Sequence, residues 1–208
     1  MKKDSGRMSR EVRRGQIVQA ALRIIGEGGV SGLTTAAIAS RAGISEANLY
    51  RHFVNKDEIL EATTDSIAGA IGDNFSRAFG GTAGPAAGLK VFFTLQLALM
   101  GGNAGIPRFM FSEELHGKPA LRKRVLGAML GFGARLESVI RDGQKTGAFS
   151  KNIDPRLTVL MFISMLQGLM FRWSLSGFSF SLRSEGMKLW KNFERCLLAV
   201  SSPPGRRK

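Results

Sequence analysis

Apolar residues recur along most of this chain at intervals of three and four, the spacing of one face of an α-helix. Near the start, Ile17, Ala21, Ile24 and Ile25 follow that spacing, and the segment stops at the glycine-rich residues 26–29. Nothing in the pattern indicates strands in quantity. The hydrophobic pattern therefore predicts an all-α fold that begins with a supporting helix.

The next predicted helix is short and ends in a tight turn. Thr34 opens it, because a hydroxyl can accept a hydrogen bond from an otherwise unpaired backbone N–H. Ile38 and Ala39 fall on its buried side. Gly43 follows its last residue and can adopt the left-handed backbone conformation that other residues resist. A second helix can then cross the first, which is the outline of a helix-turn-helix DNA reader.

Ser45 is the expected N-cap of that second helix. Leu49 and Phe53 lie four residues apart and share its buried face. The residues left to point elsewhere, and so to meet DNA, are Glu46, Ala47, Asn48, Arg51 and His52.

Capping signals and breakers predict the remaining helices. Asn55 precedes Glu58 by three residues, a helix-start signature, and a long fourth helix should follow until residues 80–85. Asp154 followed by Pro155 marks another start. The later helices are expected near residues 86–100, 106–115, 119–146, 155–175 and 184–200.

Residues 49–56, Leu-Tyr-Arg-His-Phe-Val-Asn-Lys, resemble the Leu-Tyr-x-His-Phe-x-x-Lys stretch that ends the N-terminal pattern of the TetR family of bacterial transcriptional repressors. The resemblance implies an N-terminal three-helix helix-turn-helix DNA-binding domain, followed by a larger helical domain for ligand binding and dimerisation. Where the family often has Gly, this chain has Ala47, so a slightly bulkier surface faces the DNA groove. The expected divisions are a flexible basic arm (1–9), the DNA-binding domain (10–56), the helical domain (57–200) and a basic tail (201–208).

Two kinds of DNA contact are expected. The helix N-termini at Thr34 and near Lys56 can hold phosphates, because they carry unpaired amides and a partial positive charge. The resemblance implies that Tyr50 and His52 also bond phosphates, although a tyrosine at a domain edge and a surface or core histidine are the ordinary alternatives. Asn48 could read adenine. The candidate DNA-binding residues are Thr34, Thr35, Ser45, Glu46, Ala47, Asn48, Tyr50, Arg51, His52 and Lys56.

Glu46 has two open interpretations: it accepts from a cytosine amino group, or it only favours the positive end of its own helix. Net charge does not decide between them. The chain carries +14, which suits a polyanionic partner, but residues 1–58 hold only 10 basic against 6 acidic side chains. The arginines of the N-terminal arm could follow a phosphate backbone or belong to a solvated tail. Residues 118–124 are expected to form the solvent-exposed face of a helix rather than a second anion-binding site.

The middle of the chain is rich in phenylalanine and methionine, which fill ordinary cores but also line adaptable apolar pockets. The family resemblance implies a small-molecule inducer, and Glu113, Glu114 or His116 could meet a polar end of it. The candidate pocket residues are Phe75, Phe79, Phe93, Leu97, Met100, Phe109, Met110 and Glu113.

The resemblance also implies a homodimer built from the last two helices as a four-helix bundle. Two readers held about 34 to 36 Å apart would engage a palindromic operator. Repression is the expected outcome, because a dimer on a promoter blocks polymerase. The candidate interface residues are Leu157, Met161, Met165, Gly168, Trp190, Phe193 and Leu197.

Other classes of protein fit less well. His52, His116 and Cys196 are dispersed and make no nucleophile–base or metal spacing, so neither an enzyme nor a metal or cofactor site is expected. One cysteine and no visible cleavable signal suit the cytoplasm. The most apolar run, residues 157–171, is short for a membrane span of about 20 residues. A helical carrier of apolar ligands, or a membrane-surface protein, remains the alternative to a DNA reader.

Overall fold

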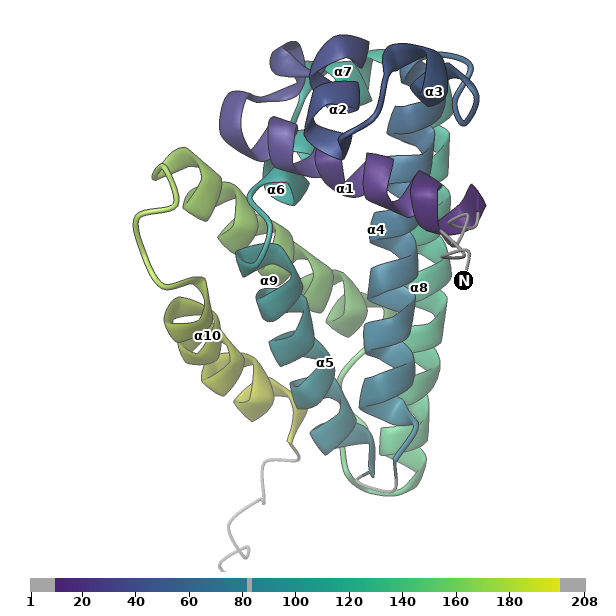
Figure 1. Ribbon diagram of the computed structural model, residues 1–208. Coiled ribbons are helices and arrows are strands. Elements are labelled where there is room, and N and C mark those ends of the chain that lie inside the picture. Colours follow the sequence, from purple (N-terminus) through teal and green to yellow (C-terminus); the bar gives the residue numbers. More distant parts are fainter. Residues whose placement is uncertain (1–9, 82–83, 199–208) are drawn as a thin grey trace, which may run out of the picture. The chain divides into compact units, whose positions relative to one another are not determined.

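A computed structural model describes residues 10–81 and 84–198; the predicted basic arm and tail lie outside these ranges. All the regular structure in the described ranges is helical, as predicted (Figure 1). The elements are α1 (Arg10–Gly28), the 3-10 turn η1 (Val30–Gly32), α2 (Thr35–Ala42), α3 (Glu46–Tyr50), α4 (Lys56–Phe79), α5 (Gly84–Gly101), α6 (Gly105–Met110), α7 (Glu113–Gly117), α8 (Pro119–Lys145), α9 (Pro155–Leu175) and α10 (Leu182–Leu197).

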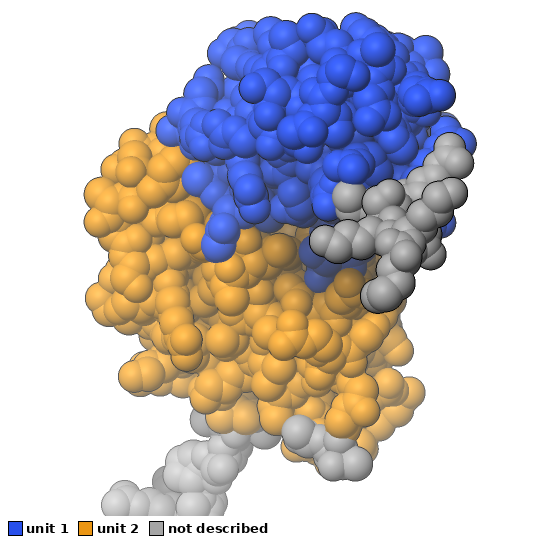
Figure 2. All heavy atoms as spheres, viewed as in Figure 1, with its two compact units in different colours: residues 1–70, 102–126 blue, residues 71–101, 127–208 orange. Residues whose placement is uncertain are grey.

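The chain divides into two compact units (Figure 2). Unit 1 consists of residues up to 70 together with 102–126, and unit 2 consists of residues 71–101 together with 127 onwards. The long helices α4 and α8 contribute residues to both units. Unit 1 therefore contains α6, α7 and the first part of α8, in addition to the segment that the sequence assigns to DNA binding.

Unit 1 is built around α1, which contacts α2 and α6. Ile17, Ala21 and Ile25 are completely buried, and they are three of the four residues that define the predicted helical stripe. At Gly105 the backbone of α6 comes so close to α1 that a Cβ atom would lie 2.0 Å from the carbonyl oxygen of Leu22. Only glycine permits this contact.

Unit 2 is built from α5, α9 and α10, which contact one another. The Phe162 ring lies among three others: its centroid is 6.0 Å from that of Phe92, 5.7 Å from Phe93 and 5.8 Å from Phe193. Such pairs stabilise a core by about 0.5–1.5 kcal/mol each beyond their buried area. The core of this unit therefore contains a cluster of four phenylalanine rings.

One predicted helix differs in the structure. The helix expected at 106–115 is divided into α6 and α7, because Ser112 breaks it and accepts a bond from the Leu115 N–H (3.2 Å) as a new N-cap. The helix expected at 155–175 has those bounds as α9, and at 21 residues it is long and apolar enough to cross a membrane, although its most apolar run, 157–171, is shorter than a span. One side of α9 is buried in the unit 2 core, and core helices pass the same test.

Candidate DNA-binding interface

Side chains cap both helices of the helix-turn-helix at the predicted positions. The Thr34 hydroxyl accepts from the Ala37 N–H (3.1 Å), and the Ser45 hydroxyl accepts from the Asn48 N–H (3.2 Å). Between the helices, Gly43 adopts φ 66°, ψ 37°, the left-handed conformation expected of it. Each cap of this kind stabilises a helix by about 1 kcal/mol. The turn is therefore set by local chemistry, and this part of the prediction is confirmed.

The recognition helix α3 is only five residues long, but its bonding continues for another turn. The N–H of Phe53 donates to the carbonyl of Leu49 (3.0 Å), and both side chains are buried. They share one face, as predicted. On the outside, the Tyr50 side chain is 52% exposed, and Arg51 is exposed beside it. The recognition helix therefore exposes a polar surface, and its opposite face is held by buried hydrophobic side chains.

The remaining candidate DNA-binding residues of α2 and α3 differ in their solvent exposure and in their hydrogen bonds. Ser45, Glu46 and Ala47 are exposed, whereas Asn48 is half-buried. Glu46 is also engaged, because the Thr35 hydroxyl donates to its Oε2 (2.9 Å). This bond joins the N-terminal ends of the two helices, so Glu46 already has a structural partner before any base is present.

Arg14 and Glu58 form a clamp behind the recognition helix. The Arg14 guanidinium donates to the carbonyl of His52 and to Glu58 Oε1 (2.9 Å), and it lies 3.9 Å from the centroid of the Phe53 ring. The other oxygen of Glu58 accepts from the Val54 N–H (2.7 Å). That backbone bond, aided by Arg14, holds the pKa of Glu58 below its usual value. The clamp thus ties the end of the recognition segment to α1 and α4.

The clamp was not foreseen from the sequence. Arg14 and Glu58 are 44 residues apart, so no local pattern pairs them. The structure places Arg14 within α1. The one local signal was the Asn55–Glu58 cap, which the structure confirms: Asn55 Oδ1 accepts from the Glu58 N–H (2.9 Å).

His52 lies half-buried beside the clamp. Its Nδ1 is buried and has no hydrogen-bond partner among the described residues. Burial lowers the pKa of His52, and the positive charges of nearby arginines, at positions 10, 13, 14 and 51, lower it further. Without DNA, this lowered pKa favours the neutral imidazole at pH 7.

The basic residues around the start of α4 are paired with carboxylates. Lys56 Nζ lies 3.8 Å from Glu114 Oε1, and Lys118 donates to Asp57 and lies 3.1 Å from Glu114. The bond to Asp57 raises the pKa of Lys118. Arg124 pairs with acidic residues 61 and 65 of α4 (2.9 Å each). Residues 118–124 thus satisfy much of their charge within unit 1, and Glu114 is occupied by two lysines.

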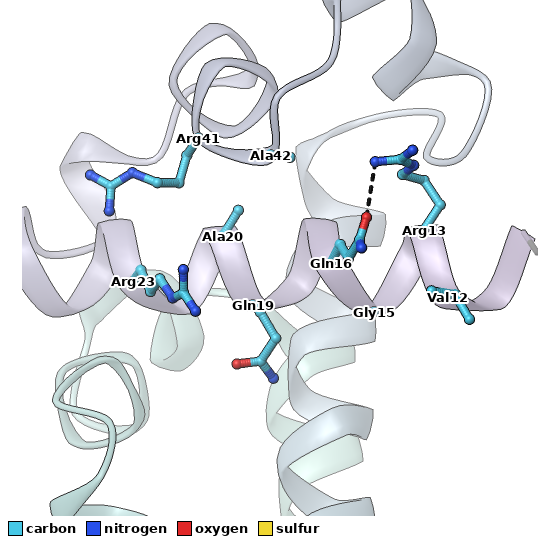
Figure 3. Close-up of a pocket in the computed structure, with 9 residues that line it drawn as sticks. All are labelled: Val12, Arg13, Gly15, Gln16, Gln19, Ala20, Arg23, Arg41 and Ala42. Atoms are coloured by element: carbon cyan, nitrogen blue, oxygen red, sulfur yellow. Dashed lines mark hydrogen bonds between the residues drawn. The ribbon is translucent and has the colours of Figure 1, made fainter. Parts of the chain in front are cut away.

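Unit 1 also carries a surface groove of ≈ 580 Å³ between α1 and the end of α2 (Figure 3). Of its three arginines, Arg13 donates to Gln16 (2.9 Å), and Arg41 is held by both oxygens of Glu27 (2.7 and 2.6 Å). Arg23 comes from α1 like Arg13, whereas Arg41 comes from α2. No sequence pattern predicts this groove, because its two walls belong to separate helices.

The structure divides the candidate pocket residues between the two units. Phe75, Phe93 and Leu97 lie in the unit 2 core, with Phe79 and Met100 packed against it. In unit 1, Phe109 is fully buried, Met110 is half-buried and Glu113 is exposed. The eight residues therefore do not line one pocket within a single unit.

The candidate dimer residues fall into two groups. Trp190, Phe193 and Leu197 are buried in the core of their own unit, so they stabilise the protomer and present no surface. Leu157, Met161 and Gly168 of α9 are exposed, and Met165 is half-buried. The larger apolar face of α10 is therefore buried in its own unit, whereas an apolar face of α9 is exposed.

The capped turn and the exposed recognition helix define a helix-turn-helix DNA-binding protein. The chain belongs to the TetR family: the model described as "Bacterial regulatory proteins, tetR family" matches residues 17–63, and "Tetracyclin repressor-like, C-terminal domain" matches residues 82–174. The protein is accordingly a DNA-binding transcriptional regulator.

Similar proteins span both parts of the chain. The nucleoid occlusion factor SlmA of Marinomonas sp. is 30% identical over 131 residues, 62% of this chain and 66% of that one. The HTH-type transcriptional regulator BetI of Burkholderia thailandensis is 50% identical over 54 residues, 26% of this chain and 28% of that one. The structure of FadR from Bacillus subtilis in complex with stearoyl-CoA has a TM-score of 0.77 at 19% identity and covers 88% of this chain and 98% of that one. That last likeness concerns the fold.

Proposed function

We propose that this regulator is a repressor that binds a palindromic operator as a homodimer and is released by a small, largely apolar ligand held in unit 2. The observation that carries the proposal is the outer face of α9. Its apolar side chains Leu157, Leu160, Met161, Phe171 and Leu175 are each at least 45% exposed. Exposed stripes of this kind are typical of interaction surfaces.

The binding partner that fits the outer face of α9 is a second copy of the chain. The exposed residues recur every three or four positions, so they lie on one side of the whole helix. Ser164 and Gly168 lie in the middle of that side and are also exposed, which permits close helix approach. A two-fold axis through α9 would bury the same patch on both protomers, as isologous dimers do. Two copies of α3 would then read the two half-sites.

Base reading in this proposal is assigned to the exposed start of α3, and positioning to Tyr50, Arg51 and the helix N-termini. Asn48 is half-buried, and its side-chain amide has no hydrogen-bond partner among the described residues, so it can bond adenine, whereas Glu46 must give up its bond to Thr35 before it can accept from cytosine. Phosphate contacts set the register without reading sequence. Ligand entry would act by shifting the population towards a reader spacing that misfits the operator.

The test combines oligomeric state with selection from a random duplex pool at near-physiological salt. The wild-type chain should be dimeric by light scattering and should retrieve an inverted repeat, and Tyr50→Ala should lose the motif. Met161→Glu should be monomeric and retrieve no inverted repeat. The matched control is Val91→Glu, which places the same charge on an exposed apolar position of α5. A monomeric wild type, or a retrieved motif without two-fold symmetry, contradicts the proposal.

Retention of duplexes without any motif, unaffected by Tyr50→Ala and abolished by salt, would mean nonspecific polyanion binding. That outcome would favour the apolar-ligand carrier over the repressor.

A further inference from the structure

Two hydrogen-bond donors in the unit 2 core have no partner among the described residues: Gln96 Nε2 on α5 and Trp190 Nε1 on α10. Gln96 is 2% exposed and Trp190 is 1% exposed. A buried donor without an acceptor is costly, so native cores rarely contain one. Two in one core require an explanation.

The rest of this unit shows that its packing can satisfy such groups. Asn74 Nδ2 donates to the carbonyl of Leu95 (3.3 Å), and the Thr158 hydroxyl donates to the carbonyl of Asp154 (2.7 Å). The second indole of the unit, Trp173, donates to the carbonyl of Phe180 (3.0 Å). The same kind of side chain is thus paired in one place and unpaired in another.

The two unpaired donors flank one aromatic ring. The ring centroids of Trp190 and Phe93 are 5.5 Å apart, and Gln96 follows Phe93 by three residues on α5, which makes the two neighbours on the helix surface. Close by, α10 touches α5 through Gly186, where a Cβ atom would lie 2.4 Å from Leu97 Cδ1. Both donors therefore belong to the junction of α5 and α10.

We propose that this junction is the polar end of the ligand site, where a neutral oxygen of the ligand accepts hydrogen bonds from Gln96 and Trp190. The inference rests on the proposed ligand-responsive function. The ligand oxygen should be neutral, because no charged side chain is among the buried residues of the described chain. A carboxylate here would be desolvated without a counter-charge, which is strongly unfavourable. The ligand class is an apolar molecule with a ketone, ester, amide or ether oxygen.

The test uses three probes of similar shape on the full-length chain: acetophenone, with a neutral acceptor; ethylbenzene, with none; and benzoate, with a charged one. The chain has two tryptophans, so ¹⁵N-indole NMR gives one signal for each, assigned with Trp190→Phe and Trp173→Phe. Acetophenone should move the Trp190 signal, leave the Trp173 signal in place and bind at least as tightly as ethylbenzene. Benzoate should bind weakest.

Gln96→Met should reverse the preference for acetophenone over ethylbenzene, because acetophenone is the better hydrated and needs a donor to compensate. A loss of about two- to tenfold in acetophenone affinity corresponds to one net hydrogen bond. Without ligand, Gln96→Met should raise the melting temperature, since it removes an unpaired amide. Trp190→Phe should lower the melting temperature less than its matched control Trp173→Phe, which breaks a formed bond.

Three outcomes overturn the proposal: acetophenone does not move the Trp190 signal, wild type and Gln96→Met show the same preference between acetophenone and ethylbenzene, or benzoate binds tightest of the three probes. Operator binding is measured on the same samples without probe. Normal operator binding with no probe response refutes only this inference, whereas absent operator binding refutes the proposed function.

Discussion

Glu58→Gln should weaken operator binding although the Glu58 side chain lies behind the recognition helix. The carboxylate accepts from the Val54 N–H (2.7 Å) and from Arg14 (2.9 Å), and Arg14 also holds the carbonyl of His52. Glutamine has almost the same shape, but it carries no charge and has only one acceptor oxygen, so one of the two bonds is lost to an NH2 group that faces a donor, and the other loses its charge-assisted character. The segment that follows α3 is then held to α1 and α4 less firmly, mainly through the bond from Arg14 to the His52 carbonyl.

The magnitude follows from the two contacts. A hydrogen bond to a charged group contributes about 1.5–3 kcal/mol, and an exposed ion pair contributes about 0–1 kcal/mol. The Arg14 and Glu58 side chains are 30% and 35% exposed, so solvent screens both terms, and the lower end applies. We expect a loss of about 1–2 kcal/mol in the stability of unit 1. If the lost free energy is what keeps α3 in its DNA-binding position, operator affinity drops by about 5- to 30-fold.

Glu61→Gln is the matched control. Glu61 lies on the same helix, is also 35% exposed and also pairs with an arginine, Arg124, but has no bond to the recognition segment. Removing a negative charge from a DNA-binding unit strengthens phosphate attraction by itself, and this variant measures that effect. Fluorescence anisotropy with the selected operator, together with urea denaturation, gives both quantities. Equal operator affinity for the two variants would refute the positioning role of the clamp.

Two further predictions concern unit 1. Gly105→Ala should destabilise unit 1 by about 1–3 kcal/mol or more, because the added Cβ would meet the Leu22 carbonyl oxygen. The control is Gly131→Ala in α8, where an added Cβ meets nothing within 4 Å, and this variant should stabilise the chain by up to about 1 kcal/mol. Equal denaturation midpoints for the two variants would contradict the prediction. His52 should titrate below its ordinary pKa of about 6.5, so the unfolded chain takes up a proton there first, and stability is lost as the pH falls from about 6.5 towards the folded-state pKa. Denaturation at pH 7.5 and 5.5 should show a smaller loss for His52→Gln than for wild type, and an identical loss would show that His52 is not responsible.

The features predicted well from the sequence are those fixed within a few residues. The caps at Thr34 and Ser45, and the turn at Gly43, depend on one side chain and the backbone beside it. The clamp of Arg14 and Glu58 depends instead on how α1 and α4 pack, which no local spacing encodes. The placement of the reader was therefore predictable, whereas the contacts that hold it were not.

The proposed dimer surface shows why the predicted interface residues were only partly informative. In α10, the large apolar residues Trp190, Phe193 and Leu197 lie on one face opposite exposed lysines, so the helix has a single choice of inner side. In α9, Phe162 and Leu166 are apolar on the inner side, and Leu157 and Met161 are apolar on the outer side. Sequence spacing cannot rank two apolar faces of one helix.

The presence of two apolar faces on α9 is itself evidence about function. A helix that is apolar all round is normally surrounded by protein or lipid, and α9 is enclosed on only one side by its own unit. Its outer face also holds the small residues Ser164 and Gly168, which suit contact with another helix better than with a ligand in solution. If Met161→Glu yields a folded monomer, the outer face of α9 is an intermolecular surface. If Met161→Glu unfolds the protein while Val91→Glu does not, the protomer depends on its partner for stability, as in obligate dimers.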